Sequence, residues 1–240
     1  LVATVPRVIE GEAVAADVRA GVADCVDRLR AADVAPTLAT VLMSEDPASE
    51  TYVAMKQDDC AEVGIETRDV RLAPDAPAEE LYAAVAGLND DPAVHGVLVQ
   101  LPLPDHVDER EVVRAVDPLK DVDAFHPENA GRVARGDPRY RPCTPHGIQR
   151  LLAAADVDLA GADVTIVGRS NVVGKPLANL LLRRAADGNA TVTVCHSRTE
   201  ELAAKTRAAD VVVAACGVPE LIDGSMLSPG AVVVDVGVSR

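Results

Sequence analysis

Short runs of branched apolar residues alternate with segments of helical periodicity along most of the chain. The runs typical of strands are 37–43, 65–72, 96–100, 162–168, 191–195, 210–216 and 231–237. The segments typical of helices are 11–32, 47–64, 78–90, 146–155, 174–186 and 200–208. An alternation of strands and helices gives a mainly parallel sheet with helices on both faces. The sequence therefore predicts an α/β fold.

The alternation is interrupted between residues 117 and 147, where Pro, Asp and Gly are dense. A loop of this length inside a compact unit is usually functional or lies between domains. We therefore divide the chain near residue 145, into an α/β domain over 1–145 and a Rossmann-like, doubly wound domain over 146–240. The two domains are expected to flank a crevice, since open α/β sheets bind ligands beyond the carboxyl ends of their strands.

The charge balance excludes some classes of partner. A net charge of −15, from 38 acidic and 23 basic residues, disfavours nucleic acid and anionic membrane surfaces. No apolar run approaches the roughly 18 residues that a membrane span needs, and no signal peptide is visible after Leu1. Five cysteines without a C-x-x-C pair favour a reducing cytoplasm over a metal site or a disulfide framework.

Two explanations fit the acidic composition. The protein is either an ordinary soluble acidic protein or one adapted to a salt-rich cytoplasm, where screening removes the repulsion between surface carboxylates. The second explanation predicts that the melting temperature falls when salt is lowered from molar to millimolar. An unchanged melting temperature would contradict it.

A glycine-containing turn, GRSNVVGKP (168–176), lies between a predicted strand and a predicted helix. In a doubly wound fold this position presents backbone N–H groups and a helix N-terminus to a phosphate. The spacing differs from G-x-G-x-x-G, because Ser170 stands where the second glycine would be. A tight strand-to-helix connection that binds nothing remains the alternative.

The end of the next strand indicates which dinucleotide such a turn would bind. NAD-specific sites place a carboxylate about 20 residues further on, where it accepts the ribose 2′-hydroxyl. Here strand 191–195 is followed by His196, Ser197 and Arg198, without a carboxylate, and Arg169 comes from the turn itself. Because guanidinium groups bind phosphate well, NADP is favoured over NAD. A cluster of basic surface residues would give the same pattern.

Four polar residues of the first domain are candidates for a second site. Tyr52 and Lys56 project from one face of the predicted helix 47–64. Gln100 ends a predicted strand, and Asp123 lies in the long loop. Each also has an ordinary explanation, as a solvated lysine, a capping glutamine or a turn aspartate. Composition and spacing alone do not make them an active site.

Several longer segments carry a resemblance to a known family. They are YVAMKQDDCAEVGI, GVLVQLPLP, KDVDAFHPENAG, PCTPHG, GRSNVVGKPLANLL, VTVCHSRT, ADVVVAACGVP and VVVDVGV. In this order, from about residue 10 to the end, the chain resembles the bifunctional methylenetetrahydrofolate dehydrogenase/methenyltetrahydrofolate cyclohydrolase family. The resemblance implies NADP-dependent oxidation of 5,10-methylenetetrahydrofolate and hydrolysis of the methenyl product to 10-formyltetrahydrofolate, in one-carbon metabolism. It also implies a homodimer.

The resemblance further implies a role for each candidate. Lys56 is the catalytic residue of the hydrolysis, Gln100 holds and tunes it, and Tyr52 lies along the folate. Asp123 binds the aminopyrimidine edge of the pterin, and the substrate site includes Leu101 and Pro102. The implied cofactor-binding residues are Gly168, Arg169, Ser170, Gly174, His196, Ser197, Arg198, Thr144 and Gly217. Burial beside a cationic substrate disfavours a lysine ammonium, so a neutral or a readily exchanging amine is expected at residue 56 near neutral pH.

The sequence departs from the family pattern in two places. The family usually has Gly after the residue equivalent to Asp123, and this chain has Ala124. Because alanine disfavours positive φ, we expect the loop to lie slightly differently against the pterin. Family members also continue beyond D-V-G with a Pro-Gly-Gly-Val-Gly-Pro-type segment and a final helix, whereas this sequence stops at Arg240. Either the segment is omitted here, which we favour, or part of the folate pocket is absent; the intact mass of the protein would decide.

Two other functions stay open on the sequence alone. The first is a dehydrogenase without useful cyclohydrolase activity, against which Lys56 and Gln100 argue. The second is a non-catalytic nucleotide-binding module, because a fold does not fix a function.

Overall fold

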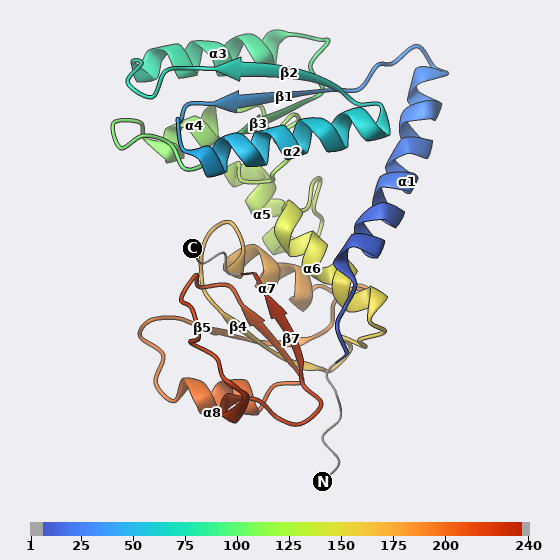
Figure 1. Ribbon diagram of the computed structural model, residues 1–240, viewed down its shortest axis with the longest axis vertical. Helices are drawn as coiled ribbons and strands as arrows, with labels where there is room; N and C mark the ends of the chain where they lie inside the picture. Colours follow the sequence, from blue (N-terminus) through green and yellow to red (C-terminus); the bar gives the residue numbers. More distant parts are fainter. Residues whose placement is uncertain (1–6, 237–240) are drawn as a thin grey trace. The chain divides into compact units, whose positions relative to one another are not determined.

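The computed structural model describes residues 7–236 and separates into two compact units (Figure 1). The N-terminal unit is Glu10–Asn129, and the C-terminal unit contains the described residues from Ala130 onward. Each unit has its own parallel sheet, which confirms the predicted α/β class. The domain boundary near residue 145 and the crevice stay predictions. Within residues 7–236, no helix is long and apolar enough to cross a membrane.

The N-terminal unit is built on a three-stranded sheet in the order β2-β1-β3, with every pairing parallel. Its elements are α1 (Gly11–Arg30), β1 (Thr37–Leu42), α2 (Pro47–Val63), β2 (Glu66–Arg71), α3 (Ala78–Asp90), β3 (Gly96–Val99) and α4 (Glu109–Ala115). Helix α5 (Pro127–Arg135) begins at the end of this unit. The five elements predicted before residue 96 and the strand at 96 are confirmed within one to two residues at each end.

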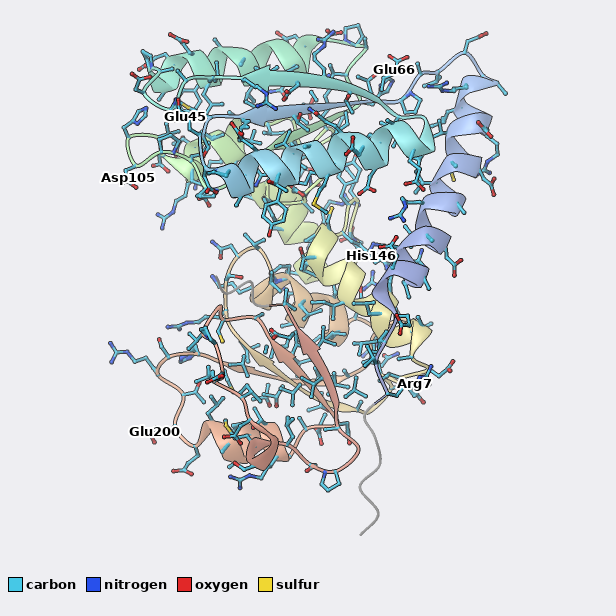
Figure 2. The ribbon with its side chains drawn as sticks, viewed as in Figure 1. Arg7, Glu45, Glu66, Asp105, His146 and Glu200 are labelled. Atoms are coloured by element: carbon cyan, nitrogen blue, oxygen red, sulfur yellow. The ribbon has the colours of Figure 1, made fainter. Side chains whose placement is uncertain are left out.

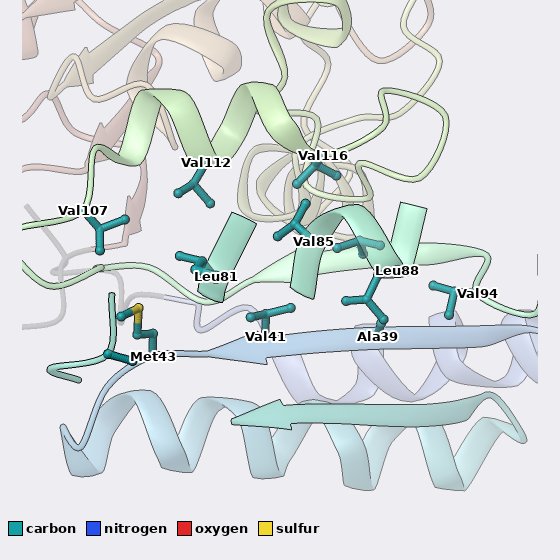
Figure 3. Close-up of a cluster of buried hydrophobic side chains, with 12 residues drawn as sticks. Ala39, Val41, Met43, Leu81, Val85, Leu88, Val94, Val107, Val112 and Val116 are labelled. Atoms are coloured by element: carbon teal, nitrogen blue, oxygen red, sulfur yellow. The ribbon is translucent and has the colours of Figure 1, made fainter. Parts of the chain in front are cut away.

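The core of the N-terminal unit fixes the central strand β1. Val41 and Met43 are fully buried against Leu81 and Val85 of α3, and α4 closes the same layer (Figure 3). Helix α2 lies on the opposite face of the sheet (Figures 1 and 3). Since both faces of β1 are covered, the carboxyl ends of β1 and β3 are held rigidly where ligands of such sheets bind.

Strand β2 is a charged edge of this sheet. Its side chains are mostly exposed, and Arg68 Nη1 donates to Asp91 Oδ2 at 2.6 Å. Charged side chains on an edge strand hinder pairing with another chain. Glu66 at the start of β2, together with Glu45 and Asp105, projects outward from this unit (Figure 2).

The ends of α2 explain why the segment around Lys56 is helical. Asp46 is the N-cap and accepts from the backbone N–H of Ser49 at 3.2 Å, and Pro47 occupies the first helical position. Gly64 ends the helix with a left-handed φ of 81°. The sequence predicted a helix over 47–64 that ends at Gly64, and the structure confirms it.

The C-terminal unit is a four-stranded parallel sheet in the order β5-β4-β6-β7. Its elements are α6 (Cys143–Ala154), β4 (Asp163–Val167), α7 (Gly174–Leu182), β5 (Thr191–Cys195), α8 (Leu202–Arg207), β6 (Val211–Ala214), the short 3-10 helix η1 (Gly224–Met226) and β7 (Val232–Asp235). The predicted strand 231–237 is confirmed up to Asp235, and Gly237 lies outside the described residues.

Helices cover both faces of this second sheet. Val164 and Ile166 of β4 pack with Leu152 of α6 and Leu177 of α7 in one buried cluster. On the other face of β4, the hydroxyl of Thr165 donates to the backbone carbonyl of Lys205 in α8 at 3.1 Å. A parallel sheet with helices on both faces is the doubly wound arrangement that the sequence predicted.

Three helical predictions need correction. No helix was predicted at α4, and the region of α5 was expected to be loop, although Pro127 at the first position and Glu128 in the first turn are a helix-start signal. The predicted helix 174–186 ends four residues early, at Leu182. The chain turns away there, since Arg183 is extended and its carbonyl accepts from the backbone N–H of Asn189 at 2.8 Å.

The loop after α7 is tied to the start of α6 by a charged cluster. Asp187 accepts from Arg141 Nη1 at 2.6 Å and from Arg183 Nη2 at 2.7 Å. The Gln149 amide donates to the backbone carbonyl of Asp187. Burial alone would raise the pKa of the Asp187 carboxyl, but the charges of Arg141 and Arg183 outweigh it and lower the pKa. Burial, followed by the charges of Arg141 and Arg150, lowers the pKa of His146 on α6 (Figure 2).

We expect Asp187→Asn to lower the free energy of unfolding by about 2 kcal/mol at pH 7, because two charge-assisted hydrogen bonds are weakened and Arg183 is left nearly buried. A carboxyl with a lowered pKa stabilises the fold above its unfolded pKa of about 3.9 and loses that contribution as pH falls through its folded pKa. Urea unfolding of both proteins between pH 7 and pH 3 should therefore show two curves that converge below pH 4. A constant difference across that range would contradict the ion-pair explanation.

Candidate active site

Lys56 and Gln100 contact each other directly. Lys56 Nζ on α2 donates to Gln100 Oε1 at 3.0 Å, and Gln100 Nε2 donates to the backbone carbonyl of Leu101 at 2.7 Å. Both side chains are half-buried. The amide of Gln100 is thus oriented by the main chain, with its oxygen toward the ammonium. A lysine that the sequence could not distinguish from a solvated one has a specific partner 44 residues away.

The topology places this pair where a ligand is expected. The chain adds β2 on one side of β1 and then β3 on the other side, so the strand order reverses next to β1. The carboxyl ends of β1 and β3 therefore form the switch point of this parallel sheet. Gln100 follows β3 directly, and its backbone N–H donates to the carbonyl of Val41 in β1 at 2.9 Å. The main chain of Gln100 is therefore fixed to β1, and its side-chain amide is fixed to the carbonyl of Leu101.

Tyr52 lies one helical turn before Lys56 on α2, so the two side chains share a face of the helix. The tyrosine is 43% exposed, and Met55 on the same face is also exposed. Val53, on the adjoining side of the helix, is buried in the unit. An exposed aromatic ring one helical turn from an anchored lysine is available for a planar ligand, and the place of Tyr52 along the folate stays a prediction.

Leu101 and Asp123 line the same small pocket. Its other lining residues are mostly apolar, and they are Val97, Val99, Val112, Val113, Val116, Asp121 and Phe125. Leu101 is joined to Pro102 by a cis peptide bond, and Pro102 is exposed. The structure thus brings Lys56 to Gln100 through a hydrogen bond, and Leu101 to Asp123 through a shared pocket.

The premise of the expectation about Ala124 was wrong. Alanine was expected to exclude positive φ, but Ala124 has φ of 57° and is only 3% exposed. The chain therefore keeps the left-handed turn next to Asp123 and accepts a cost of about 1–2 kcal/mol for it. That the loop lies slightly differently against the pterin stays a prediction.

A larger side chain at this position should be far more costly. We expect Ala124→Val to lower the free energy of unfolding by about 2 kcal/mol or more, because a β-branched residue is strained in the left-handed region and the site is buried. Ala124→Gly should change it by less than about 1 kcal/mol, since relief of strain is offset by greater chain entropy in the unfolded state. Urea denaturation of the three proteins tests this order. Equal stability of the valine variant would contradict it.

The turn after β4 in the C-terminal unit is formed by two tightly packed glycines. A Cβ on Gly168, whose φ is 137°, would lie 2.2 Å from the carbonyl oxygen of Ala215. A Cβ on Gly174 would lie 2.1 Å from the carbonyl oxygen of Gly168. The order β5-β4-β6-β7 reverses between β4 and β6, so this turn also lies at a switch point.

Ser170 has a structural role that the sequence analysis missed. Its hydroxyl oxygen accepts from the backbone N–H of Val173 at 3.0 Å and of Gly174 at 3.4 Å, at the start of α7. Ser170 therefore supports the turn in place of the second glycine of the G-x-G-x-x-G pattern. Asn171, which accepts from Lys175 Nζ at 2.7 Å, braces the same turn and was also not singled out.

The end of β5 forms a compact turn of its own. The His196 N–H donates to the Thr199 hydroxyl at 2.8 Å, and the Arg198 N–H donates to His196 Nδ1 at 3.1 Å. Ser197 and Arg198 are exposed, as is Arg169 in the glycine turn. Both guanidinium-bearing residues thus stand at carboxyl ends of neighbouring strands, β4 and β5.

Two further cofactor candidates lie on other elements of the unit. Gly217, with φ of 63°, follows β6 and lines a hollow with Leu221 and Val233. Thr144 is exposed in the first turn of α6. Gly217 lies at the carboxyl edge of the sheet, where the glycine turn is also found. Thr144 belongs to helix α6, and its place in the cofactor site stays a prediction.

The two switch points and their side chains define a two-unit α/β protein with a dinucleotide-type turn in one unit and a lysine–glutamine site in the other. Comparison with known proteins gives the same division. Residues 9–123 match the family model described as tetrahydrofolate dehydrogenase/cyclohydrolase, catalytic domain. Residues 142–240 match tetrahydrofolate dehydrogenase/cyclohydrolase, NAD(P)-binding domain. The chain belongs to the tetrahydrofolate dehydrogenase/cyclohydrolase family.

Individual relatives are similar over nearly the whole chain. The bifunctional protein FolD of Natronomonas pharaonis is 66% identical over 98% of this chain and 79% of its own length. The crystal structure of the bifunctional FolD dehydrogenase/cyclohydrolase of Campylobacter jejuni has a TM-score of 0.92 at 40% identity, covering 97% of this chain and 81% of its own. The Trypanosoma brucei enzyme, solved with NADP and an inhibitor, has a TM-score of 0.91 at 35% identity, covering 98% and 80%.

Proposed function

We propose that the protein oxidises 5,10-methylenetetrahydrofolate to 5,10-methenyltetrahydrofolate with NADP and hydrolyses the product to 10-formyltetrahydrofolate, in one-carbon metabolism. Membership of the family through both units supports the pair of activities. The observation that carries the hydrolytic half is the hydrogen bond from Lys56 Nζ to Gln100 Oε1 at a switch point of the sheet.

The residues of the C-terminal unit fit a dinucleotide phosphate. Any side chain at Gly168 or Gly174 would collide with backbone atoms, so this turn is built for close approach and tight packing. Arg169 and Arg198 are exposed and would hold a 2′-phosphate, and no carboxylate follows β5 at 196–198 to prefer a free 2′-hydroxyl. When bound, NADP accepts a hydride from the methylene carbon of the folate. The family's NADP-bound structure supports the same cofactor.

The hydrolysis needs proton transfer, which the chain supplies through Lys56. Water adds to the methenyl carbon and loses a proton, and the carbon–nitrogen bond then breaks as the leaving nitrogen gains one. An amine can accept the first proton and donate the second. The Gln100 oxygen accepts from the Lys56 nitrogen and keeps it in place.

The folate is bound by the other candidates of the N-terminal unit. The carboxylate of Asp123 matches the paired N–H donors of an aminopyrimidine, which favours bidentate binding of the pterin. Leu101 contributes apolar surface to the same pocket, and Tyr52 offers its exposed ring to the rest of the folate. Pro102 lies beside them in the sequence and belongs to the same proposed site.

One coupled assay tests the function against its alternatives. The protein is mixed with NADP and methylenetetrahydrofolate, and the absorbances of NADPH and of the methenyl chromophore are followed together. NADPH formation with only transient methenyl absorbance is expected of the bifunctional enzyme. Accumulation of methenyl at the rate of its spontaneous hydrolysis would indicate a dehydrogenase alone. No NADPH would indicate a non-catalytic nucleotide-binding module.

The proposal includes a homodimer in the cytoplasm, with no nucleic acid or membrane partner. The net charge of −15 supports the exclusion of polyanionic partners. Light scattering of the purified protein tests the dimer, and a monomer at micromolar concentration would contradict it. The acidic composition fits a surface adapted to salt, for which the salt dependence of the melting temperature remains the test.

A further inference from the structure

The segment that carries Asp123 is anchored at one end to helix α3. Lys120 Nζ donates to the backbone carbonyls of Leu88 at 3.0 Å, Asn89 at 2.6 Å and Asp91 at 2.8 Å. The last carbonyls of a helix lack partners within the helix, and one ammonium satisfies those of Leu88 and Asn89 while it also binds the carbonyl of the C-cap residue Asp91. This contact fixes the segment before Asp123 to a rigid element of the core.

The main chain of the same segment lies along strand β3. The Val97 N–H donates to the carbonyl of Lys120 at 2.7 Å, and Val97 pairs with Asp121 in a parallel bridge. Val122 packs over Gly96 so closely that a Cβ there would lie 2.6 Å from its Cγ1. The segment is thus positioned on β3, the strand that also positions Gln100.

Asp121 closes the other end of the loop. Its carboxylate accepts from the backbone N–H of Phe125 at 3.2 Å, from that of His126 at 2.9 Å, and from Asn129 Nδ2 at 2.8 Å. The same Asn129 nitrogen donates to the carbonyl of Pro118 at 2.8 Å. Asp121 is only 5% exposed, so these donors replace the water that a carboxylate requires.

The turn held in this way contains Asp123 and the left-handed Ala124. Asp121 precedes the turn and binds the N–H groups that follow it, so its carboxylate sets the width of the loop. Asp121 and Asp123 line the same pocket with Leu101. A change in the loop width moves the Asp123 carboxylate relative to β3, on which the rest of the site is built.

We propose that Asp121 is a positioning residue for the folate: it holds the loop so that the Asp123 carboxylate meets the aminopyrimidine edge of the pterin. The proposal rests on the proposed function, in which Asp123 binds that edge. Asn129 is its partner, because it fixes the Asp121 carboxylate from α5 and the start of the loop through Pro118.

The test is Asp121→Asn in the whole protein. The amide keeps the size of the side chain, but its NH₂ group faces N–H donors of the loop, so at least one donor loses its acceptor. We expect the KM for methylenetetrahydrofolate to rise about tenfold, with kcat and the KM for NADP changed by less than about twofold, as for a loss of ground-state binding alone. Asn129→Ala should raise the same KM, and the double variant should show less than the product of the two effects.

Val26→Ala serves as the matched control for stability. Val26 is buried in α1 of the same unit, so its truncation lowers the melting temperature without touching the loop. A folate KM that stays within about twofold in Asp121→Asn, at a melting temperature lowered as in Val26→Ala, would overturn the proposal. Failure of the function itself is distinguishable: the wild-type protein would then be inactive, or Asp123→Asn would leave the folate KM unchanged.

Discussion

Lys56→Met is expected to lower the cyclohydrolase rate at least 100-fold while the protein still binds NADP. A positioned acid–base group contributes roughly 10²–10⁴-fold to a rate, and the thioether can neither accept nor donate a proton. The glycine turn lies in the other compact unit, so the loss of the amine should leave the Kd for NADP unchanged. Hydrolysis of added methenyltetrahydrofolate, corrected for the spontaneous rate, measures the first effect. Titration of NADP by calorimetry measures the second.

A second variant at residue 56 separates proton transfer from charge, and a variant at another lysine serves as the control. Lys56→Arg keeps the positive charge near Gln100 but cannot release a proton at neutral pH, so it should be as defective as the methionine variant. Lys205→Met removes an exposed lysine of α8 and should hydrolyse at the wild-type rate. Wild-type hydrolysis by the arginine variant would show that a fixed charge suffices and would refute the proton-transfer role of Lys56.

Much of the fold was predictable because its signals are local. Asp46, Pro47 and Gly64 define the ends of α2 within a few residues of sequence, and the apolar strands of both units needed only their periodicity. The Rossmann-like topology followed from the strand–helix alternation. The error at 183–186 arose because the helical pattern continues there, whereas the long-range pairing of Asp187 with Arg141 favours a loop.

The contacts of the candidate site were less predictable because they join residues distant in sequence. Lys120 in isolation is indistinguishable from a solvated lysine, and its acceptors lie about 30 residues earlier at the end of α3. Ala124 has no intrinsic preference for positive φ, so the left-handed turn arises from the anchors around it. The sequence could select Lys56 and Gln100 through the family pattern, but their hydrogen bond became visible only in the folded chain.

Gly168→Ala is expected to reduce the free energy of unfolding of the C-terminal unit by more than about 3 kcal/mol and to abolish NADP binding. Its Cβ would lie 2.2 Å from the carbonyl oxygen of Ala215, so β4 and β6 would have to separate, and φ of 137° is open only to glycine. The same displacement would shift the carbonyl against which Gly174 packs, at the start of α7. Urea unfolding and NADP titration measure the two losses.

The matched control is Gly147→Ala, which adds the same methyl group to the same unit. Gly147 lies inside α6, and a Cβ on it would meet nothing within 4 Å, so alanine should stabilise the helix by up to about 1 kcal/mol. NADP binding should be unchanged in this variant. If Gly168→Ala unfolded no more readily than Gly147→Ala and still bound NADP, the turn would have to relax without moving β6. The close packing of Gly168 on Ala215 would then not be what holds the turn in its binding conformation.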